Sequence, residues 1–448
     1  MNKHNNNLDS LDLTKSQDIA LKGIMNGINS QGMLDLGIYS LVGAAGTGKT
    51  FLTNLILSRI YDIDPKACVA LLSPTHKALA NLESHTRNCK NNVIYNTLHS
   101  YLGLKMIINQ DGTQSFKKGN KKIKRVNYII LDEASFVDVS LFTFLQEFLM
   151  MNAGITALIY VGDKCQLSPV DNTDKLSPVF STVKNTFVLD EVIRNGDHQV
   201  LDFFTKIRRL INIYDDLTEK GEIDSKRTKI RNKFNSVLKE ELQKSEANPE
   251  SKIQFIENIA QMYIQNKDEQ ALVVSYTNYT VDNINSTIRK HFRPGCSHYP
   301  EPGETIVIQN TVENKFMNNE TVHVKTVQES FETIGHLQIP VKEIHVQSRR
   351  GKVKFSIPHG TESAQNLIKY KNALKESKRW LEFYKVDDTF ASFKYKYACT
   401  IHKSQGSTCS DVYVDLKGLL NTQMSLSQLL RLFYVASSRA SNRIYIAV

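Results

Sequence analysis

The chain has 448 residues, a mass of 50.9 kDa and a net charge of +10, with 56 basic against 46 acidic side chains. Hydrophobic residues make up 41% and charged residues 23%, a balance typical of globular proteins that excludes disordered, collagen-like and disulfide-rich classes. No run approaches the roughly 18 consecutive apolar residues of a membrane helix, and the start lacks an apolar signal-peptide core. We therefore expect a soluble, cytoplasmic protein with no membrane partner, and the excess of basic side chains favours a polyanionic partner.

The first part of the chain alternates predicted helices and strands. Helical periodicity covers residues 11–36 and 49–61. Short apolar segments predict buried strands at residues 37–42, 67–73, 128–131 and 157–161. Because strands that alternate with helices form parallel sheets covered by helices, the sequence predicts an α/β fold.

Two later regions have a different character. Residues 200–262 are rich in charges of both signs at helical spacing, so we expect a solvated helical face with no functional cluster. Residues 296–395 contain β-branched runs punctuated by prolines, which favours a small β-rich insertion. The α/β pattern then resumes at Ala398.

One internal similarity indicates a second α/β domain. Residues 71–82 (LLSPTHKALANL) align with residues 273–284 (VVSYTNYTVDNI), sharing a serine, a threonine, an asparagine and several aliphatic positions. The alignment favours two related domains. The alternative is a chance match between two ordinary strand-to-helix junctions.

A phosphate-binding pattern lies between a predicted strand and a predicted helix. Residues 43–50 (GAAGTGKT) match G-x-x-x-x-G-K-[ST], and the alternative of a chance loop is weakened by this context. In this pattern backbone N–H groups surround a β-phosphate, the lysine reaches the β and γ oxygens, and the threonine hydroxyl ligates Mg²⁺. The predicted nucleotide-binding residues of the loop are Gly43, Gly46, Gly48, Lys49 and Thr50.

The predicted strand at residues 128–131 delivers two consecutive carboxylates, Asp132 and Glu133. Beside a phosphate loop they suit separate roles, with Asp132 toward the metal ion and Glu133 as general base on the attacking water. A strand that ends in Asp-Glu for structural reasons alone is the alternative. The combination predicts hydrolysis of a nucleoside triphosphate, with ATP and Mg²⁺ as cofactors.

Several segments resemble the motifs of superfamily 1 helicases. They are residues 13–17 (LTKSQ), 132–135 (DEAS), 161–170 (VGDKCQLSPV), 400–407 (TIHKSQGS) and 434–440 (YVASSRA). The QLSPV and HKSQG forms and the compact length resemble the RecD-like branch. The resemblance covers roughly residues 11–205 and 265–448, and it implies movement 5′-to-3′ on single-stranded DNA.

The resemblance also implies a domain plan with two RecA-like P-loop domains. The first motor domain would span residues 1–175, with a small β-hairpin insertion at about residues 103–126. The second would combine residues 176–290 and 396–448. Residues 291–395 would form an SH3-like, β-rich insertion in the second domain.

Further nucleotide contacts follow from the resemblance alone. Gln17 would read adenine through its amide, which can pair a donor and an acceptor with that base. Gln166 would sense the γ-phosphate. Gln405 and Gly406 would also contact the nucleotide.

Two arginines are implied in the same way. Arg194 and Arg439 would reach the γ-phosphate from the second domain, where a guanidinium stabilises transition-state charge and couples hydrolysis to domain closure. Ser438 stands where many relatives have threonine, and Thr408 stands where another branch has a ribose-binding glutamate. The sugar selectivity therefore stays open.

Residues near strand ends are candidate contacts for nucleic acid. Thr75 and Thr277 stand at equivalent ends in the two similar segments, where a hydroxyl and helix-start N–H groups can hold a phosphate without reading sequence. The resemblance extends this track to a second pair of segments. The candidates are Thr75, His76, Thr97, His99, Thr277, Asn278, Thr400 and His402. The alternative is that the threonines are ordinary helix N-caps.

Residues 105–116 predict a β-hairpin with an Asp-Gly turn, followed by a cluster of basic residues between Lys117 and Arg125. By resemblance the hairpin occupies the position of a strand-separating pin. Phe116 would stack on the last base pair, and the lysines would hold displaced phosphates. A solvated basic loop is the alternative.

Together these features predict an ATP-driven, Mg²⁺-dependent DNA helicase and single-stranded DNA translocase that moves 5′-to-3′. The alternative is a single-strand-stimulated nucleoside triphosphatase that strips proteins from nucleic acid without processive unwinding. The expected partners are single-stranded and tailed duplex DNA, with a phage single-strand-binding, replication or recombination protein as a candidate. The expected active form is a monomer, and the preference for DNA over RNA stays open.

Overall fold

The computed structural model describes the chain as two compact units. Unit 1 combines Met1–Leu104, Lys118–Phe234 and Met424–Ser441, and unit 2 combines Lys105–Lys117, Asn235–Gln423 and Asn442–Val448. The described residues are 13–30, 36–86, 92–119, 123–152, 155–169, 176–193, 198–244, 271–309, 316, 319–335, 337–348, 351–420 and 424–447. None of the helices described there is long and apolar enough to cross a membrane.

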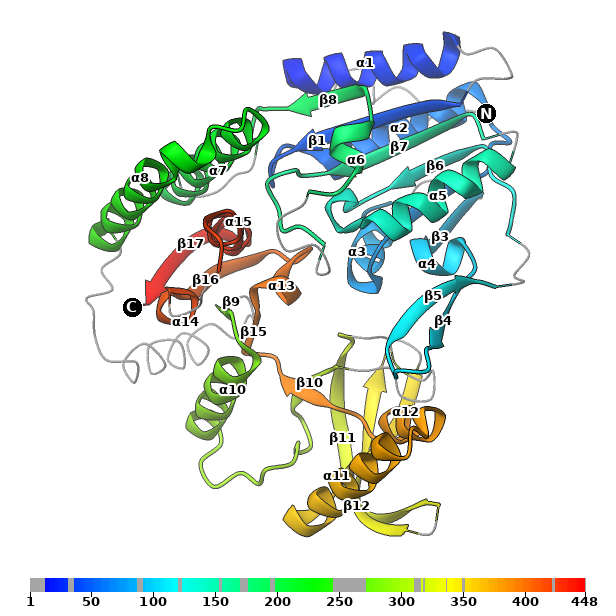
Figure 1. Cartoon of the computed structure of the whole chain (residues 1–448), viewed down its shortest axis with the longest axis vertical. Coiled ribbons are helices and arrows are strands. Elements are labelled where there is room, and N and C mark those ends of the chain that lie inside the picture. Colours follow the sequence, from blue (N-terminus) through cyan, green and yellow to red (C-terminus); the bar gives the residue numbers. More distant parts are fainter. Residues whose placement is uncertain are drawn as a thin grey trace, which may run out of the picture. The chain divides into compact units, whose positions relative to one another are not determined.

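Unit 1 is built on a sheet of six parallel strands in the order β3-β2-β6-β7-β1-β8 (Figure 1). The strands are β1 (Gly37–Gly43), β2 (Val69–Ser73), β3 (Val93–Thr97), β6 (Tyr128–Leu131), β7 (Ala157–Gly162) and β8 (Asn185–Leu189). The four central strands read as nearly continuous apolar runs because both faces of a parallel sheet are covered. The predicted α/β class with a parallel sheet is confirmed.

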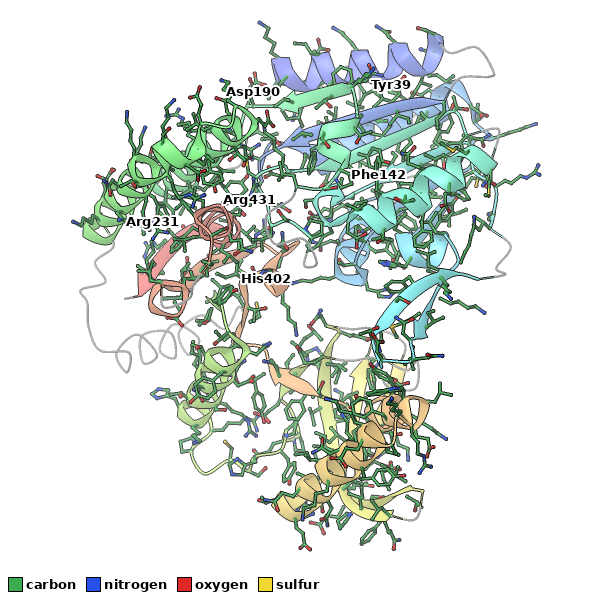
Figure 2. The ribbon with its side chains drawn as sticks, viewed as in Figure 1. Tyr39, Phe142, Asp190, Arg231, His402 and Arg431 are labelled. Carbon is green, nitrogen blue, oxygen red and sulfur yellow. The ribbon has the colours of Figure 1, made fainter. Side chains whose placement is uncertain are left out.

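Helices cover both faces of this sheet and enclose a separate core on each. They are α1 (Lys15–Ser30), α2 (Lys49–Ile63) and α3 (His76–Thr86) on one face, and α4 (Leu98–Tyr101), α5 (Val139–Met151) and α6 (Val179–Thr182) on the other. Tyr39 belongs to the first core, and Phe142 packs against the second (Figure 2). Successive strand residues alternate, with Ile130 in the first core and Ile129 in the second.

The first helix begins at Lys15, later than the predicted start at residue 11. Two reciprocal hydrogen bonds explain this start. The Gln17 backbone N–H donates to Thr14 Oγ1 at 3.3 Å, and the Thr14 N–H donates to Gln17 Oε1 at 3.1 Å. Such a capping box fixes the point at which a helix begins.

Two further helices of unit 1 are α7 (His198–Glu219) and α15 (Leu426–Ser437), and the boundary between the units, after Phe234, falls within α8 (Ile223–Lys244). The prediction of a solvated helical face at residues 200–262 is wrong for α7, because Phe203, Phe204 and Ile207 are buried and the helix packs against α15. Its mixed charges obscured an apolar stripe at helical spacing. Most of α8 is exposed, and residues 245–262 lie outside the described part of the chain.

Unit 2 contains two larger sheets and a two-stranded hairpin. A sheet in the order β15-β9-β16-β17 comprises β9 (Ala271–Ser275), β15 (Ala398–Thr400), β16 (Cys409–Asp415) and β17 (Ala440–Ala447). An antiparallel sheet in the order β13-β12-β11-β10-β14 comprises β10 (Thr305–Ile308), β11 (Thr321–Ile334), β12 (Leu337–Ser348), β13 (Gly351–Pro358) and β14 (Phe393–Tyr395). The hairpin pairs β4 (Leu104–Ile108) with β5 (Gln114–Lys118). The short helices α13 (Ile401–Ser404) and α14 (Leu416–Leu420) and the longer α10 (Asn278–Phe292) accompany the first sheet.

The β-rich region contains two helices that its overall composition did not predict. They are α11 (Gly360–Glu376) and α12 (Trp380–Thr389). Leu374 of α11 and Val386 of α12 share a core with Ile339 and Val341 of β12. The β-branched runs lie on the strands, so averaging over residues 296–395 concealed a contiguous helical segment. The SH3-like label and the domain boundaries stay predictions.

Candidate functional site

The phosphate loop joins β1 to α2 in unit 1. Gly46 and Gly48 adopt left-handed φ values of 83° and 80°, which glycine tolerates best. The Lys49 ammonium group donates to the backbone oxygens of Gly43 at 2.9 Å and Ala44 at 2.8 Å, so the lysine folds back over its own loop. Thr50 is the second residue of α2, so its hydroxyl group lies at the first turn of this helix.

Gln17 packs against this loop from the start of α1. Its side chain is buried, and the amide Nε2 donates to the Thr47 backbone oxygen at 3.0 Å. A Cβ on Gly48 would lie 2.5 Å from that Nε2, so the close contact requires glycine there. Since an amide has two N–H donors and two acceptor lone pairs, the capping box and this bond leave Gln17 one donor and one lone pair for a purine edge.

Asp132 and Glu133 follow β6, as the sequence predicts, and both are partly buried. Glu133 has a φ of 54°, an uncommon left-handed value for a side chain other than glycine, asparagine or aspartate. Its backbone N–H donates to Asp132 Oδ1 at 2.9 Å. The chain therefore turns sharply after the strand, and the two carboxyl groups leave it at adjacent positions.

Burial is the largest influence on the pKa values of Glu133, Asp132 and Lys49. Burial and the neighbouring Asp132 raise the pKa of Glu133 to about 7, against the opposing influence of Arg439 and Lys49. Burial also raises the pKa of Asp132 and lowers the pKa of Lys49, although the surrounding carboxylates oppose the change in the lysine. A carboxyl group with a pKa near 7 is suited to accept a proton at neutral pH.

The oxygens available here fit a magnesium ion. Thr50 offers a hydroxyl and Asp132 a carboxylate, and Mg²⁺ prefers such hard oxygen ligands completed by water and phosphate. A bound Mg²⁺ would neutralise charge on the phosphate oxygens.

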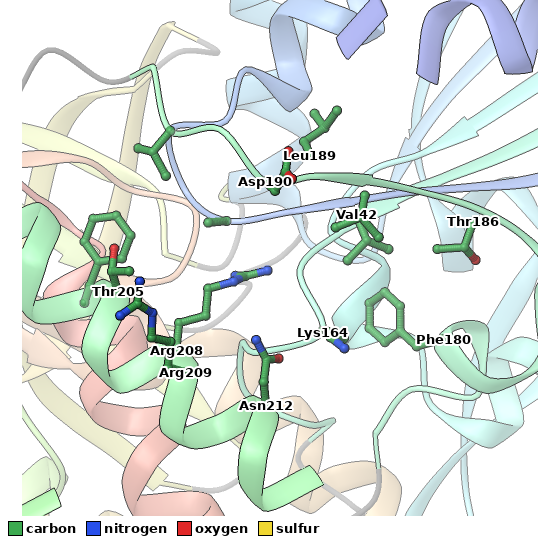
Figure 3. A pocket seen from close by; sticks show the side chains of 14 residues that line it. Val42, Lys164, Phe180, Thr186, Leu189, Asp190, Thr205, Arg208, Arg209 and Asn212 are labelled. Atoms are coloured by element: carbon green, nitrogen blue, oxygen red, sulfur yellow. The ribbon is translucent and has the colours of Figure 1, made fainter. Parts of the chain in front are cut away.

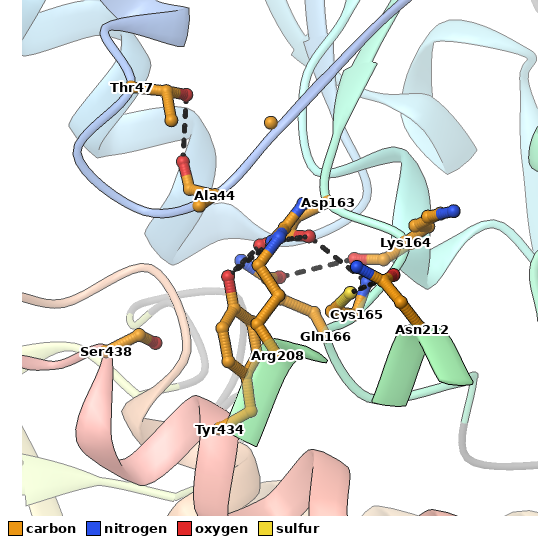
Figure 4. Close-up of polar contacts among 12 residues, drawn as sticks. Ala44, Thr47, Asp163, Lys164, Cys165, Gln166, Arg208, Asn212, Tyr434 and Ser438 are labelled. Carbon is orange, nitrogen blue, oxygen red and sulfur yellow. Dashed lines mark hydrogen bonds and ion pairs between the residues drawn. The ribbon is translucent and has the colours of Figure 1, made fainter. Parts of the chain in front are cut away.

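A buried charge cluster holds the residues that follow β7 (Figure 4). The Arg208 guanidinium donates to Asp163 Oδ1 and to the Tyr434 hydroxyl, both at 2.7 Å, and this hydroxyl donates to Asp163 Oδ2 at 2.5 Å. Asp163 is fully buried. We call Asp163, Arg208 and Tyr434 the Asp163 cluster, and it connects β7 to both α7 and α15.

The charges in this cluster support one another. Burial and the Asp163 carboxylate raise the pKa of Tyr434 well above its ordinary value. Burial disfavours the charged form of Arg208, but Asp163 outweighs it and raises the pKa of the guanidinium, which stays protonated. The buried carboxylate is therefore compensated by one cation and one hydroxyl, as a buried charge requires.

A second arginine holds the same segment. Arg431 of α15 donates to both oxygens of Asp215 on α7, at 2.6 and 2.8 Å, and to the Lys164 backbone oxygen at 2.6 Å. Gln166 accepts a hydrogen bond at its Oε1 from the Ser135 hydroxyl at 3.3 Å. The segment that carries Gln166 is thus fixed by side chains from α7, α15 and the turn after Glu133.

Sequence reasoning missed Arg208 and Asp215 and assigned no role to Asp163, Tyr434 or Arg431. Arg208 stands four residues after the buried Phe204 and three before the buried Ile211, on the edge of the apolar stripe of α7. A cation at such a position, in a helix otherwise taken as solvated, was the one available signal. Its partners come from distant segments that no local pattern connects.

A pocket of about 600 Å³ adjoins the cluster in unit 1 (Figure 3). The cationic side chains Lys164, Arg208 and Arg209 line it, against the single carboxylate of Asp190, and Ala44 of the phosphate loop forms part of its wall. Its lining is therefore positive and borders the loop that the sequence assigns to phosphate.

The remaining predicted nucleotide residues are distributed as follows. Arg439 is buried at the end of α15, donates to Ser438 Oγ at 2.8 Å, and acts electrostatically on Glu133. Gln405 and Gly406 belong to unit 2, where Gln405 is buried after α13 and Gly406 has a φ of 72°. Arg194 lies outside the described residues.

The four candidate threonines all cap helices. Each hydroxyl oxygen accepts a bond from a backbone N–H three residues later, and the donors are Ala78 for Thr75, Ser100 for Thr97, Thr280 for Thr277 and Lys403 for Thr400, at 3.1 to 3.4 Å. The N-cap alternative therefore describes their local geometry. The cap uses only the oxygen of each hydroxyl, and at Thr277 the hydrogen is available when the Thr280 hydroxyl, 2.9 Å away, is the donor of that pair. Capping and phosphate binding are therefore compatible.

The two units place these threonines in matching positions. In unit 1, β2 and β3 are adjacent and parallel with Ser73 opposite Thr97, and in unit 2 β9 and β15 are adjacent and parallel with Ser275 opposite Thr400. The internal similarity thus corresponds to the same strand-to-helix geometry in both units. The accompanying polar residues at these ends are His76, His99, Asn278 and His402.

Known proteins match the chain in agreement with this geometry. Residues 30–172 match the family described as AAA domain, and residues 395–447 match the UvrD-like helicase C-terminal domain. The ATP-dependent DNA helicase Dda of Enterobacteria phage T4 is 23% identical over 96% of this chain and 97% of that protein. An uncharacterized protein of Acanthamoeba polyphaga mimivirus is 25% identical over 91% of this chain and 94% of the other.

The fold is also matched by a solved structure. The Pif1 helicase from Bacteroides, in complex with ADP-AlF3 and ssDNA, aligns with a TM-score of 0.51 at 16% identity, covering 97% of this chain and 92% of that one. This likeness supports RecA-like P-loop domains in the present fold. The predicted resemblance to superfamily 1 helicases is confirmed, and the matched relatives include Pif1 and RecD helicases.

Proposed function

From its similarity to superfamily 1 helicases of the Pif1 and RecD type, we propose that this chain is an ATP-driven DNA helicase that moves 5′-to-3′ on single-stranded DNA. The observation that carries the proposal is the grouping of Lys49, Asp132 and Glu133 at the carboxyl ends of β1 and β6. A cation, a metal-binding carboxylate and a carboxyl group with a pKa near 7 are what hydrolysis of a phosphoanhydride needs.

ATP would bind on the phosphate loop, with adenine against the remaining donor and acceptor of Gln17. The β and γ oxygens would take the place of the two backbone oxygens that Lys49 now contacts. Glu133 would accept a proton from the attacking water, and Gln166 would report the γ-phosphate through the segment held by the Asp163 cluster. Arg194 and Arg439 would stabilise charge on the γ-phosphate.

The threonine caps would grip the DNA backbone. Thr75 and Thr97 in unit 1, and Thr277 and Thr400 in unit 2, can each donate a hydroxyl hydrogen to a phosphate beside helix-start N–H groups. Such contacts read no base, so they suit a protein that moves along any sequence. Cycles of ATP binding and hydrolysis would shift the two grips alternately along one strand.

The hairpin of β4 and β5 would separate the strands. The Trp380 indole N–H donates to the Gln110 backbone oxygen at 3.1 Å, and the Tyr384 hydroxyl donates to the Gly112 backbone oxygen at 2.8 Å. A Cβ on Gly112 would lie 2.7 Å from the Trp380 ring, so the turn packs closely on α12. A hairpin held at its turn resists deflection, which favours unwinding over protein stripping alone.

Strand displacement tests the proposal. Duplexes with a 5′ or a 3′ single-stranded tail, each in a DNA and an RNA version, are incubated with the chain, ATP and Mg²⁺. We expect displacement from the 5′-tailed DNA duplex only, and activity should fall as salt rises because phosphate contacts release counterions. Preferential displacement from the 3′ tail would overturn the direction, and displacement from RNA alone would overturn the DNA assignment.

The relevant partners are then single-stranded DNA and tailed duplex DNA. We expect one chain to suffice, with a single-strand-binding, replication or recombination protein as the candidate protein partner. Analytical ultracentrifugation of the chain on a short tailed duplex measures this stoichiometry.

A further inference from the structure

In unit 2 a serine and an aspartate connect the end of β9 to the end of β16. The two strands are adjacent and parallel, with Val274 opposite Val414, so Ser275 and Asp415 stand next to each other one residue further along. The Ser275 hydroxyl donates to Asp415 Oδ2 at 3.0 Å, and the Gly418 N–H donates to Oδ1 of the same carboxylate at 3.1 Å. Both side chains are buried, and two donors of unit 2 hold this carboxylate.

The matching positions in unit 1 carry Ser73 and Asp132. There β2 and β6 are adjacent and parallel, with Leu72 opposite Leu131, and the Asp132 N–H donates to the Leu72 backbone oxygen at 2.9 Å. Asp132 Oδ1 accepts from the Glu133 N–H, so one carboxylate oxygen is held by the backbone, as in unit 2. Because neighbouring strands lie about 4.8 Å apart and paired residues point to the same face, Asp132 is within reach of the Ser73 hydroxyl.

The serine of unit 1 differs from its counterpart in one respect. Ser73 is fully buried, and its Oγ has no hydrogen-bond partner among the described residues, whereas Ser275 Oγ is bonded to a carboxylate. A buried hydroxyl without a partner costs free energy, and most buried polar side chains in proteins are paired. Since an acceptor lies at the end of the neighbouring strand, a change of side-chain rotamer would complete the bond.

Asp132 is also the carboxylate that the site offers to a magnesium ion. A carboxylate that binds a metal is usually held by a hydrogen bond from a further residue, which fixes its orientation toward the ion. Ser73 lies two residues before Thr75, the candidate phosphate contact, and Pro74 between them has a restricted backbone. The end of β2 therefore connects the candidate metal ligand to the candidate DNA contact.

We propose that Ser73 is a positioning residue that couples metal binding to DNA binding: its hydroxyl donates to Asp132 when the nucleotide and its metal ion are bound, as the matching serine does in unit 2. This inference rests on the proposed helicase function. A DNA phosphate at Thr75 would fix the end of β2 and with it the Ser73 side chain, which favours the bond to Asp132. By thermodynamic linkage, the metal ion and DNA then raise each other's affinity by the same factor.

The first test compares the stability of three serine variants without nucleotide or metal. Ser275→Ala removes a hydroxyl that is bonded to Asp415, whereas Ser73→Ala removes one that has no partner among the described residues. The control is Ser40→Ala, because Ser40 on β1 is also buried, its Oγ also has no partner there, and the residues opposite it carry no carboxylate.

We expect the urea midpoint of unfolding to fall for Ser275→Ala and to stay or rise for the other two variants, since an unbonded buried hydroxyl contributes no stability. A fall in Ser73→Ala equal to that in Ser275→Ala would mean that the Ser73 hydroxyl is already bonded in the free chain, and it would overturn the proposal.

The second test measures metal affinity at equilibrium, so it does not depend on turnover. Mn²⁺ replaces Mg²⁺ in the presence of ADP, and the electron paramagnetic resonance signal of free Mn²⁺ gives the bound fraction. Ser73→Ala should weaken Mn²⁺ binding about 10-fold, the scale of a lost hydrogen bond to a metal ligand, and Ser40→Ala should not change it. Wild-type Mn²⁺ affinity in Ser73→Ala would contradict the positioning role.

The third test repeats this titration with saturating single-stranded oligothymidine. We expect the oligonucleotide to tighten Mn²⁺ binding about 5-fold in the wild type and in Ser40→Ala, and to have no effect in Ser73→Ala. A full DNA effect in Ser73→Ala, or none in the wild type, would refute the coupling. If the wild type binds neither Mn²⁺ with ADP nor oligothymidine, the proposed function itself fails; if it binds both and Ser73→Ala behaves like it, only the role of Ser73 fails.

Discussion

The phosphate end of unit 1, meaning the phosphate loop, the acidic pair and the Asp163 cluster, differs from the hairpin of unit 2 in how its charged side chains are partnered. In the Asp163 cluster the carboxylate is fully buried and compensated by Arg208 and Tyr434. On the hairpin, Lys105 and Lys117 are exposed. The carboxylate of the Asp163 cluster is partnered within the chain, whereas the two hairpin lysines have no carboxylate partner among the described residues.

This difference has an energetic consequence. Removing one member of a buried ion pair leaves an uncompensated charge and costs roughly 3–5 kcal/mol, while removing an exposed cation costs ~1 kcal/mol or less. Substitutions at the phosphate end should therefore affect folding and chemistry together. Substitutions on the hairpin should affect the unwinding of DNA and leave the folding stability nearly unchanged.

The largest expected effect is on ATP turnover. Lys49→Ala and Glu133→Gln should each lower kcat by about 10²–10⁴ or more, since the first removes the cation on the phosphoryl group and the second removes the general base. Glu133→Gln should still bind ATP, because only the base is neutralised. Steady-state hydrolysis and equilibrium binding of an ATP analogue measure both effects.

The control for this comparison is Glu376→Gln, at an exposed position of α11, which should behave as the wild type. Near-wild-type turnover in Lys49→Ala or Glu133→Gln would remove the role assigned to that residue.

The next effect separates two neighbouring arginines. Arg208→Ala should lower the free energy of unfolding by about 3–5 kcal/mol because Asp163 loses its cation, while Arg209→Ala, on an exposed side chain, should change it by about 0.5 kcal/mol or less. Urea unfolding of the full chain measures the difference. Equal losses in the two variants would mean that the Asp163 cluster does not stabilise unit 1.

The pKa of Glu133 predicts a pH dependence. Because the carboxyl must be deprotonated to act as a base and its pKa is about 7, kcat/KM should fall as the pH is lowered through about 7. The folding stability depends on pH in the opposite sense. A carboxyl pKa raised by folding stabilises the protein at acidic pH, and this contribution is lost as the pH rises through 7.

Glu133→Gln should therefore be more stable than the wild type above pH 7, with the gain disappearing toward pH 4.5, the ordinary value of the carboxyl. Thermal unfolding of both proteins across this range measures the gain. A constant difference at every pH would contradict the raised pKa.

The smallest expected effect concerns a single cap. Thr277→Ala removes the oxygen that accepts from Thr280 N–H and should cost about 1 kcal/mol, whereas Thr277→Ser keeps both the cap and a hydroxyl. If the hydroxyl also grips phosphate, Thr277→Ser should bind single-stranded DNA as the wild type does, and Thr277→Ala should bind more weakly. Full affinity in Thr277→Ala would leave Thr277 as a cap alone.

The sequence predicted features that are local in the chain. The phosphate loop and the acidic pair lie within short segments that adjoin predicted strands, so pattern and periodicity were sufficient to find them. The Asp163 cluster was not predictable in this way, because its three members come from α7, α15 and the end of β7, and an arginine in a charge-rich helix resembles an ordinary surface residue.

Other features were within reach of the sequence and were missed. The helices α11 and α12 were not predicted because the composition of residues 296–395 was averaged over a region that contains both strands and helices. The sequence could not separate a capping role of the threonines from a phosphate contact, since both require a threonine at the start of a helix.

The helicase assignment is tested by ATP-dependent strand displacement on a 5′-tailed DNA duplex, with the wild-type chain and Glu133→Gln side by side. We expect that the wild type separates the strands and that Glu133→Gln binds the substrate without separating it. Hydrolysis of ATP by the wild type, stimulated by single-stranded DNA but with no strand separation, would contradict the helicase assignment and favour a translocase that only strips proteins.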